Sequence, residues 1–218
     1  MPNSKRKRLL VRQHRRQPAF PSRHSGIDRM ASDKLLSRDE LIFRKGQKAT
    51  QIYKVKSGCI RTFTHHRDGR RFVTAFYFPG DYFGLDMRER HRVTASAVTP
   101  SEILLIGRRP LMLGAANNVT VANEMLRVTN LELQRAHQHS LLLRISANER
   151  VGQFLFDMKK RGRRKEVDVA MSRQDIADYL NLTVESVARA LTQLEKVSAI
   201  SKRSTRRIAV HMRKSMAA

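Results

Sequence analysis

The stretch "MSRQDIADYLNLTVESVARALTQLE", residues 171–195, decides the fold, because a helical pattern stops at residues 181–183 and restarts at once. Ser172 favours a helix N-terminus, and Asp175 follows three residues later as a carboxylate variant of the capping box. Asn181 can adopt the left-handed backbone conformation that ends a helix. The sequence therefore predicts a first short helix that stops before Asn181.

A second helix is predicted directly after this turn. Thr183 can cap its N-terminus, and Val187, Leu191 and Leu194 recur at spacings of four and three, which gives the helix one buried face. Two short helices joined in this way form a helix-turn-helix, whose second helix can enter the major groove of DNA.

Two charged side chains lie on the opposite face of the second helix. Glu185 and Arg189 are four residues apart and point away from Val187 and Leu191. An arginine can donate two parallel hydrogen bonds to guanine O6 and N7, and a glutamate can accept one from cytosine N4. The same spacing also suits a surface ion pair, and the two roles are compatible. We therefore predict that this pair reads bases.

A wing is predicted after the second helix. Residues 199–210, "AISKRSTRRIAV", read as two short strands around a polar turn. Basic side chains in such a hairpin suit phosphate contacts, which position a protein on DNA without reading its sequence. The alternative is a merely solvated hairpin. The candidate phosphate contacts here are Lys202, Arg203 and Arg206.

The charge of the chain agrees with a polyanionic partner. Lysine and arginine number 44 against 19 acidic residues, a formal charge of +25, which predicts attraction to nucleic acid or to an anionic membrane. No apolar run approaches the roughly 20 residues of a membrane span. The motifs of a phosphate-binding loop, a nucleophile elbow and a zinc enzyme are missing. We expect a non-enzymatic, cytosolic protein that does not span a membrane.

The chain before this region predicts a β-domain followed by a long helix. Glycines at 46, 58, 69 and 80 separate short β-like segments about every 11 to 12 residues, as in a small sandwich or roll. Beyond Pro110, glycine is absent from residues 115–149, and apolar residues keep a seven-residue register. Such a register is typical of a coiled-coil dimer contact, and the alternative is a helix packed on the β-domain. The register consists of Val121, Val128, Leu131, Leu142 and Ile145.

In this order, the motifs resemble the CRP/FNR family of bacterial transcription regulators, over residues 41–210, and the stretch 171–195 is similar to its FixK branch. The resemblance implies an α+β chain with an N-terminal β-roll (a double-stranded β-helix of the cyclic-nucleotide-binding type), a long dimerisation helix and a C-terminal winged helix-turn-helix. It also implies a homodimer that binds double-stranded DNA at a palindrome of TTGAT-like half-sites and recruits or hinders RNA polymerase. Of these two we expect an activator, in the bacterial cytoplasm and associated with the nucleoid. The expected ranges are a flexible basic tail at 1–35, the β-roll at 36–114, the dimerisation helix at 115–146 and the winged helix-turn-helix at 147–218.

The resemblance also assigns roles to single residues. Glu185 and Arg189 match the base readers of the family. Ala188 stands where the FNR-type pattern Glu-x-x-Ser-Arg has serine, so a methyl group for contact with thymine is kept and the hydroxyl is lost. Residues that match phosphate-contacting positions of the family are Ser172, Arg173, Thr183 and Ser186.

The expected sensor region departs from the family's known sensors. One cysteine, Cys59, cannot supply the four that hold an iron–sulfur cluster. The Gly-Glu-Leu and Arg-Ser-Ala patterns that cradle a cyclic nucleotide are missing from residues 80–98, although Arg92 lies there. We therefore expect no cofactor and no bound effector, as the FixK branch is thought to work. A ligand-gated sensor is the alternative.

Cysteine and histidine offer two further candidate sites. Cys59 follows a turn glycine and is a candidate redox site if it is exposed with a lowered pKa; otherwise it is a small core residue. His137 and His139 are two apart in a predicted helix and point to different faces, and His65 and His66 are expected to be solvated. We predict no metal site.

Overall fold

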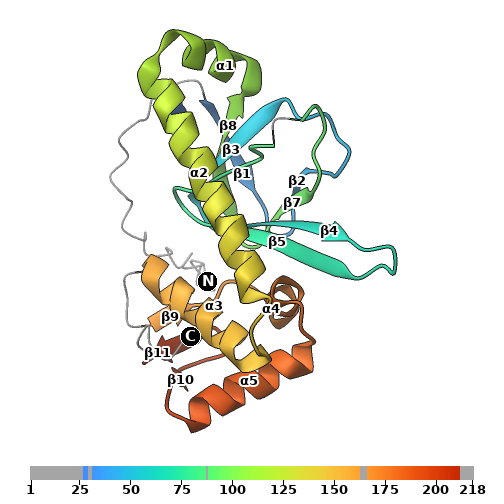
Figure 1. Cartoon of the computed structure of the whole chain (residues 1–218), viewed down its shortest axis with the longest axis vertical. Coiled ribbons are helices and arrows are strands. Elements are labelled where there is room, and N and C mark those ends of the chain that lie inside the picture. Colours follow the sequence, from blue (N-terminus) through green and yellow to red (C-terminus); the bar gives the residue numbers. More distant parts are fainter. Residues whose placement is uncertain (1–26, 29–30, 87, 163–165, 212–218) are drawn as a thin grey trace, which may run out of the picture.

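The computed structural model describes residues 27–28, 31–86, 88–162 and 166–211, and confirms the predicted α+β fold: a β-roll, long helices and a winged helix-turn-helix (Figure 1). The tail predicted at residues 1–35 is wrong at its end, because residues 31–36 pair as an edge strand and Ile27 is buried. The few apolar residues at this end follow an arginine-rich sequence and show no periodicity, so the strand was not predicted. Residues 1–26 lie outside the described part of the chain.

Eight strands form the β-roll as two four-stranded antiparallel sheets, in the orders β1-β8-β3-β6 and β2-β7-β4-β5. The four predicted glycine turns are present, each with φ between 82° and 94°, a region that favours glycine. At Gly58 a Cβ atom would also collide with Ser101. The strands are β1 (Ala31–Leu36), β2 (Leu41–Phe43), β3 (Gln51–Ser57), β4 (Ile60–His65), β5 (Arg71–Tyr77), β6 (Tyr82–Phe83), β7 (Thr94–Ala97) and β8 (Ser101–Gly107).

Aromatic rings fill the interior of the β-roll. The imidazole of His91 stacks on Phe43 with ring centroids 3.6 Å apart, and Phe43 in turn stacks on Tyr53 at 5.3 Å. Phe83 lies 4.9 Å from Tyr53 and 5.3 Å from Tyr77. All five side chains are buried. The space between the two sheets is therefore occupied by the protein's own rings.

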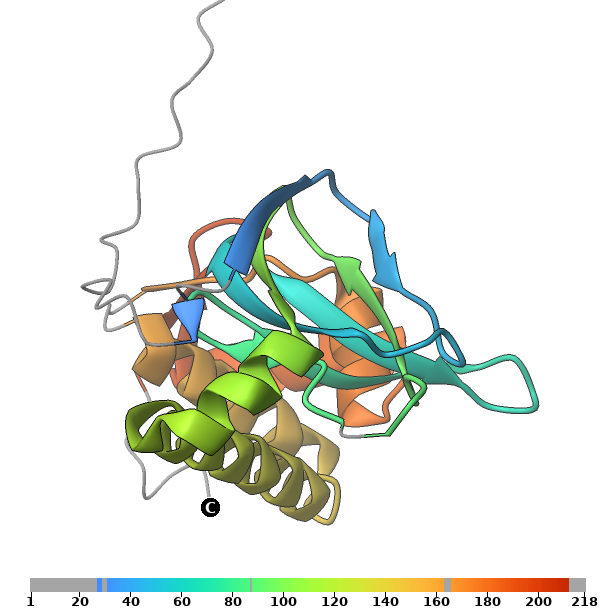
Figure 2. The same cartoon turned by 90° about the horizontal axis from the view of Figure 1, so that it is seen from above.

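Three helices follow the β-roll: α1 (Arg108–Asn117), α2 (Val119–Leu142) and α3 (Ala147–Gly162). Seen from above, the green and olive ribbons of α1 and α2 lie along one side of the roll (Figure 2). Asn118 begins α2, because its side-chain oxygen accepts hydrogen bonds from the backbone N–H groups of Thr120 and Val121. Along its length, α2 packs one face against the β-roll and exposes the opposite face.

The apolar register predicted for dimerisation lies mainly on the inner face of α2. Val121, Val128 and Leu142 are buried within the chain, so they have little surface to offer a second copy. Leu131 is half exposed, and Ile145 packs against the C-terminal core. A seven-residue spacing identifies an apolar face of a helix, but it does not tell whether that face packs within the chain or against a second copy. The outer face carries its own set of exposed apolar side chains: Val119, Leu126, Leu133 and Leu141.

The C-terminal part contains α4 (Arg173–Leu180) and α5 (Val184–Lys196), packed on a three-stranded sheet in the order β10-β11-β9. Its strands are β9 (Glu166–Asp168), β10 (Ile200–Lys202) and β11 (Arg207–Val210). Val187 and Leu191 from α5 meet Ile176 and Leu180 from α4 in one buried cluster. The predicted helix-turn-helix and wing are both present.

Packed rings join the end of α2 to α4. His139 stacks on Tyr179 with centroids 4.1 Å apart and an interplanar angle of 3°, and its Nε2 lies 2.7 Å from the carbonyl oxygen of Tyr179. Phe76 of the β-roll lies 5.2 Å from the same tyrosine ring. His139 is buried, and this desolvation lowers its pKa even though the hydrogen bond to Tyr179 acts in the opposite direction.

We expect the contact at His139 to weaken in acid. The folded protein favours the neutral imidazole, so its contribution is complete above an ordinary histidine pKa of about 6.5 and is lost as the pH falls below that value. His139→Gln keeps a hydrogen-bond donor but does not titrate. Thermal unfolding between pH 8 and pH 5 should show a smaller fall in melting temperature for this variant than for the wild type.

The exposed His66 in the hairpin between β4 and β5 provides the control, because His66→Gln should leave the pH profile unchanged. Burial also lowers the pKa of His91, which remains in both variants and keeps part of the acid sensitivity. Identical pH profiles for His139→Gln and the wild type would contradict the assignment to His139.

Candidate nucleic-acid interface

The turn between α4 and α5 has the predicted geometry. Ser172 Oγ accepts a hydrogen bond from the Asp175 N–H at 3.0 Å, and the Asp175 carboxylate accepts one from the Ser172 N–H, so the capping box is closed. Asn181 ends α4 in the left-handed conformation, with φ 51° and ψ 52°. Thr183 then caps α5 by accepting from the Ser186 N–H at 3.1 Å. Local hydrogen bonds thereby fix the position at which the second helix begins.

The predicted reading face of α5 is open to solvent. Glu185, Ala188 and Arg189 are exposed, while Val187 and Leu191 on the opposite face are buried. In Figure 1 α5 lies at the end of the molecule away from the β-roll. The three residues predicted to read bases are therefore brought together on one exposed surface of α5.

The two charged side chains of this face are not ion-paired to each other. Among the ion pairs of the described residues there is none between Glu185 and Arg189, and Arg189 instead donates to Ser186 Oγ at 3.4 Å. Hydrogen bonds from the backbone N–H of Glu185 itself and from Thr183, with the Arg189 charge nearby, lower the pKa of Glu185. Glu185 is thus an ionised acceptor, and Arg189 keeps donors free for a base.

One residue on this face was missed by the sequence prediction. Thr192 is exposed and lies one helical turn beyond Ala188, to whose carbonyl oxygen it donates a hydrogen bond at 3.1 Å. It follows Ala188 by four residues, so extending the helical spacing by one turn would have found it. A threonine can offer both a hydroxyl and a methyl group to a base edge.

The wing presents the predicted basic side chains, but they are not equivalent. Lys202, Arg203 and Arg206 are all exposed. Lys202 forms an ion pair with Glu195 of α5 at 2.8 Å, whereas no ion pair of the described residues involves Arg203 or Arg206. The Arg173 side chain reaches the wing from α4 and donates to the Thr205 carbonyl at 3.4 Å. Arg203 and Arg206, like the exposed Arg207 of β11, are therefore charged wing side chains with no ion pair among the described residues.

The structure argues against the candidate redox site at Cys59. The thiol is 2% exposed, and burial is the main cause that raises its pKa, with Asp175 and Asp81 adding to the effect. Reactive cysteines are accessible and have a lowered pKa, so the Cys59 side chain has the environment of a core residue. Within the described residues, no group of three or more histidine, cysteine, aspartate or glutamate side chains is placed to hold a metal ion.

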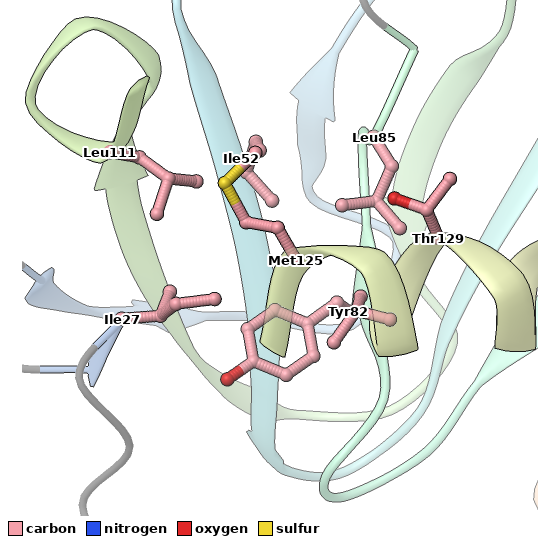
Figure 3. A pocket seen from close by; sticks show the side chains of 8 residues that line it. Ile27, Ile52, Tyr82, Leu85, Leu111, Met125 and Thr129 are labelled. Carbon is pink, nitrogen blue, oxygen red and sulfur yellow. The ribbon is translucent and has the colours of Figure 1, made fainter. Parts of the chain in front are cut away.

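A small apolar cavity lies between the β-roll and α2 (Figure 3). Its volume is about 20 Å³, close to the space of one water molecule. Ile27, Tyr82 and Met125 are among the side chains that line it, and the Ile27 side chain is buried there. The cavity as it stands has no room for a nucleotide.

These features define a class of protein, a DNA-binding regulator with a winged helix-turn-helix behind a β-roll. A cyclic nucleotide-binding domain family matches residues 34–112, and a Crp-like helix-turn-helix domain family matches residues 149–218. The chain belongs to the CRP/FNR family of transcription regulators and is similar to its FixK branch. The relatives are regulators with this DNA-binding domain and are not enzymes.

Three relatives illustrate the likeness. The nitrogen fixation regulation protein FixK of Azorhizobium caulinodans is 41% identical over 189 residues, which are 84% of this chain and 76% of that protein. The protein of the same name from Rhizobium meliloti is 36% identical over 77% of each chain. The solved structure of FixK2 from Bradyrhizobium japonicum has a TM-score of 0.81 and 37% identity, and the match covers 85% of this chain and 95% of that one.

Proposed function

We propose that this protein is a dimeric transcription activator that reads a palindrome of TTGAT-like half-sites without a bound effector. The exposed face of α5, with Glu185, Ala188 and Arg189 side by side, carries this proposal. Arginine and glutamate supply a donor pair for guanine and an acceptor for cytosine, and the alanine methyl suits thymine. Selection of bound sequences from a random DNA pool tests it. A palindrome containing such half-sites is expected, and a single unrepeated site would contradict the dimer.

The dimer contact that we propose lies on the outer face of α2. Leu126 and Leu133 are seven residues apart and are 70% and 68% exposed. Val119 continues the same register one step earlier, so the three residues form a seam along the helix. A second copy related by a two-fold axis would cover this seam and fix the distance between the two reading helices.

Work without an effector is supported by the packing of the β-roll. Phe43, Tyr53, Phe83 and His91 fill its interior, and the cavity against α2 has space for about one water molecule. The reading face of α5 is exposed and is covered by no other described part of the chain. Purified protein without additives is therefore expected to bind its operator.

A ligand-gated sensor remains the second candidate because of one surface feature. An open hollow of about 600 Å³ at one end of the β-roll is lined by basic side chains that include Lys45, Arg88, Arg90 and Arg92. Such a hollow could attract an anionic ligand. Calorimetry with cyclic nucleotides separates the two functions: we expect no saturable heat, and saturable micromolar binding that raises operator affinity would favour the sensor.

The activator role is supported by the name of one relative. One relative, 32% identical, is named the transcriptional activatory protein AadR of Rhodopseudomonas palustris. We propose that the bound dimer recruits RNA polymerase. Transcription in vitro from a promoter that carries the selected operator tests this, with added polymerase and no other regulator. A reduced transcript level would instead indicate repression.

No helix in the described part of the chain is long and apolar enough to cross a lipid bilayer.

Arg203→Ala should weaken DNA binding evenly across sequences. Its exposed guanidinium, which lies in no ion pair of the described residues, is placed in the wing to contact a phosphate. Loss of that contact should lower the slope of log affinity against log salt concentration by about 1 per site. Lys202→Ala should have a smaller effect, because Glu195 already neutralises that lysine. Fluorescence anisotropy at several salt concentrations measures both, and a loss confined to the operator would contradict a phosphate contact.

A further inference from the structure

Two arginines of the β-roll hold the first helix of the helix-turn-helix. Arg61 in β4 donates to the Asp175 carboxylate at 2.8 Å, and Arg71 in β5 donates to the same oxygen at 2.7 Å. Arg71 also donates to Asp178 at 2.6 Å. These bonds join residues that are more than 100 positions apart in the sequence, with the arginines in β4 and β5 and the aspartates in α4.

These ion pairs are better shielded from solvent than ordinary surface pairs. The side chains of Arg61 and Asp175 are 12% and 4% exposed, and that of Asp178 is 10% exposed. The guanidinium groups of Arg61 and Arg71 both lie within 6 Å of the centroid of the Phe63 ring, close enough for a favourable cation–π interaction. Removal of one partner from such a cluster leaves an uncompensated charge, which costs far more than loss of an exposed pair.

The cluster contacts the first turn of α4, at Asp175. Asp175 also closes the capping box with Ser172, so the arginines contact the group that fixes the first turn of the helix. Burial alone would raise the pKa of Asp175, but hydrogen bonds from Ser172 and the charges of Arg61 and Arg71 hold it below its ordinary value. The carboxylate is therefore ionised, and the arginines of the β-roll are bonded to the same group that caps the N-terminus of α4.

The other end of α4 is held by one further arginine. Arg150 of α3 donates to the Leu180 carbonyl at 3.0 Å and to the Leu143 carbonyl at 2.8 Å. It thereby joins the last turn of α4 to the end of α2, immediately before the Asn181 turn that leads into α5. With both ends of α4 fixed, the direction of α5 relative to the β-roll and the long helix is fixed as well.

We propose that Arg61 and Arg71 are positioning residues for DNA reading: their ion pairs with Asp175 and Asp178 hold α5 in its reading orientation without a ligand. This inference rests on the proposed function as a dimer that needs no effector. A dimer on a palindrome must place two reading helices about one DNA turn, roughly 34 Å, apart at the same time. A loosely held helix pair would have to lose its extra rotational freedom on binding, which lowers affinity for the operator.

The double variant Arg61→Ala/Arg71→Ala tests the proposal. Operator affinity should fall by about tenfold or more, because an ordering cost of at least 1.4 kcal/mol is added to specific binding. Affinity for unrelated DNA should change much less, since phosphate attraction does not require both helices in register. The matched control is Arg67→Ala/Arg70→Ala, which removes the same charge from the exposed tip of the β4–β5 hairpin. Equal effects of the two double variants would overturn the proposal.

A rescue separates positioning from a general loss of stability. Arg71→Ala should weaken operator binding, and Arg71→Lys, which keeps a positive charge facing Asp175 and Asp178, should retain a large part of it while both variants keep the wild-type circular dichroism spectrum. An Arg71→Lys protein as weak as Arg71→Ala would count against a role through this contact.

The orientation of the helix pair is measured directly without DNA. Spin labels at Arg44→Cys and Gln193→Cys, both exposed, report the distance between the β-roll and α5 in full-length protein diluted with unlabelled chain. We expect one narrow distance distribution for the wild type and a broad one for Arg61→Ala/Arg71→Ala. An unchanged narrow distribution would overturn the positioning role. If the wild type binds its operator without a ligand while the variant keeps a narrow distribution, the positioning role fails and the proposed function stands. A wild type that binds its operator only with a ligand contradicts the proposed function, whatever the distance distribution.

Discussion

Replacement of Leu126 and Leu133 together by glutamate should leave a folded protein that is monomeric and has lost its operator. Both side chains are largely exposed on the outer face of α2, so the change leaves no cavity within the chain. Two carboxylates facing their symmetry mates would repel and would have to be desolvated in the seam. Since each half-site then binds alone, operator affinity should fall by about 10²- to 10⁴-fold. Light scattering and anisotropy measure the two effects.

The control adds the same two charges to α2 outside the seam. Gln134 and Gln138 are exposed and lie on other sides of the helix, so Gln134→Glu/Gln138→Glu should remain dimeric with operator affinity close to that of the wild type. If Leu126→Glu/Leu133→Glu were still a dimer, the seam would lie elsewhere. If Val121→Ala alone produced monomers without loss of folding, the inner register would be the dimer contact after all.

Arg189→Ala should remove most of the preference for one base pair in each half-site. A bidentate arginine–guanine contact contributes about 1–3 kcal/mol of discrimination, which corresponds to roughly 5- to 150-fold per half-site. The Arg189 guanidinium is exposed and only loosely bonded to Ser186, so the alanine variant should fold normally. Binding to a panel of operators, each substituted at one position, should show a flat response at the position that Arg189 reads.

Arg189→Lys distinguishes base reading from simple charge. Lysine keeps the positive charge but lacks the two parallel donors, so discrimination should still fall while the salt dependence stays that of the wild type. Arg203→Ala should behave in the opposite way, with intact discrimination and a lower salt slope. An Arg189→Ala protein that kept its full operator preference would mean that this side chain does not read DNA.

Much of the DNA-binding end follows from the sequence because its signals are local. The capping box of Ser172 and Asp175, the left-handed Asn181 and the Thr183 cap each depend on residues within three or four positions. The same holds for the glycine turns of the β-roll. Hydrogen bonds of this kind depend only on short stretches of sequence, so the sequence predicts the helix-turn-helix and the exposed face of its second helix residue by residue.

Long-range contacts could not be predicted in the same way. Val121 and Leu126 are both apolar residues on α2, and only the position of the β-roll decides that the first is buried and the second exposed. The ion pairs of Arg61 and Arg71 with Asp175 join residues more than 100 positions apart, and in the sequence they are indistinguishable from surface charges. Partner choice among many arginines is a property of the folded chain.

The ring-filled β-roll sets a barrier to the gain of ligand control. To open a nucleotide-sized chamber, mutation would have to truncate several of Phe43, Tyr53, Phe83 and His91, which stack on one another. Each large-to-small change at such a ring costs about 3–5 kcal/mol, and two of them approach the whole stability of an ordinary domain. Descendants of this protein should therefore acquire new regulation by altered synthesis or turnover more readily than by opening an inducer site between the two sheets.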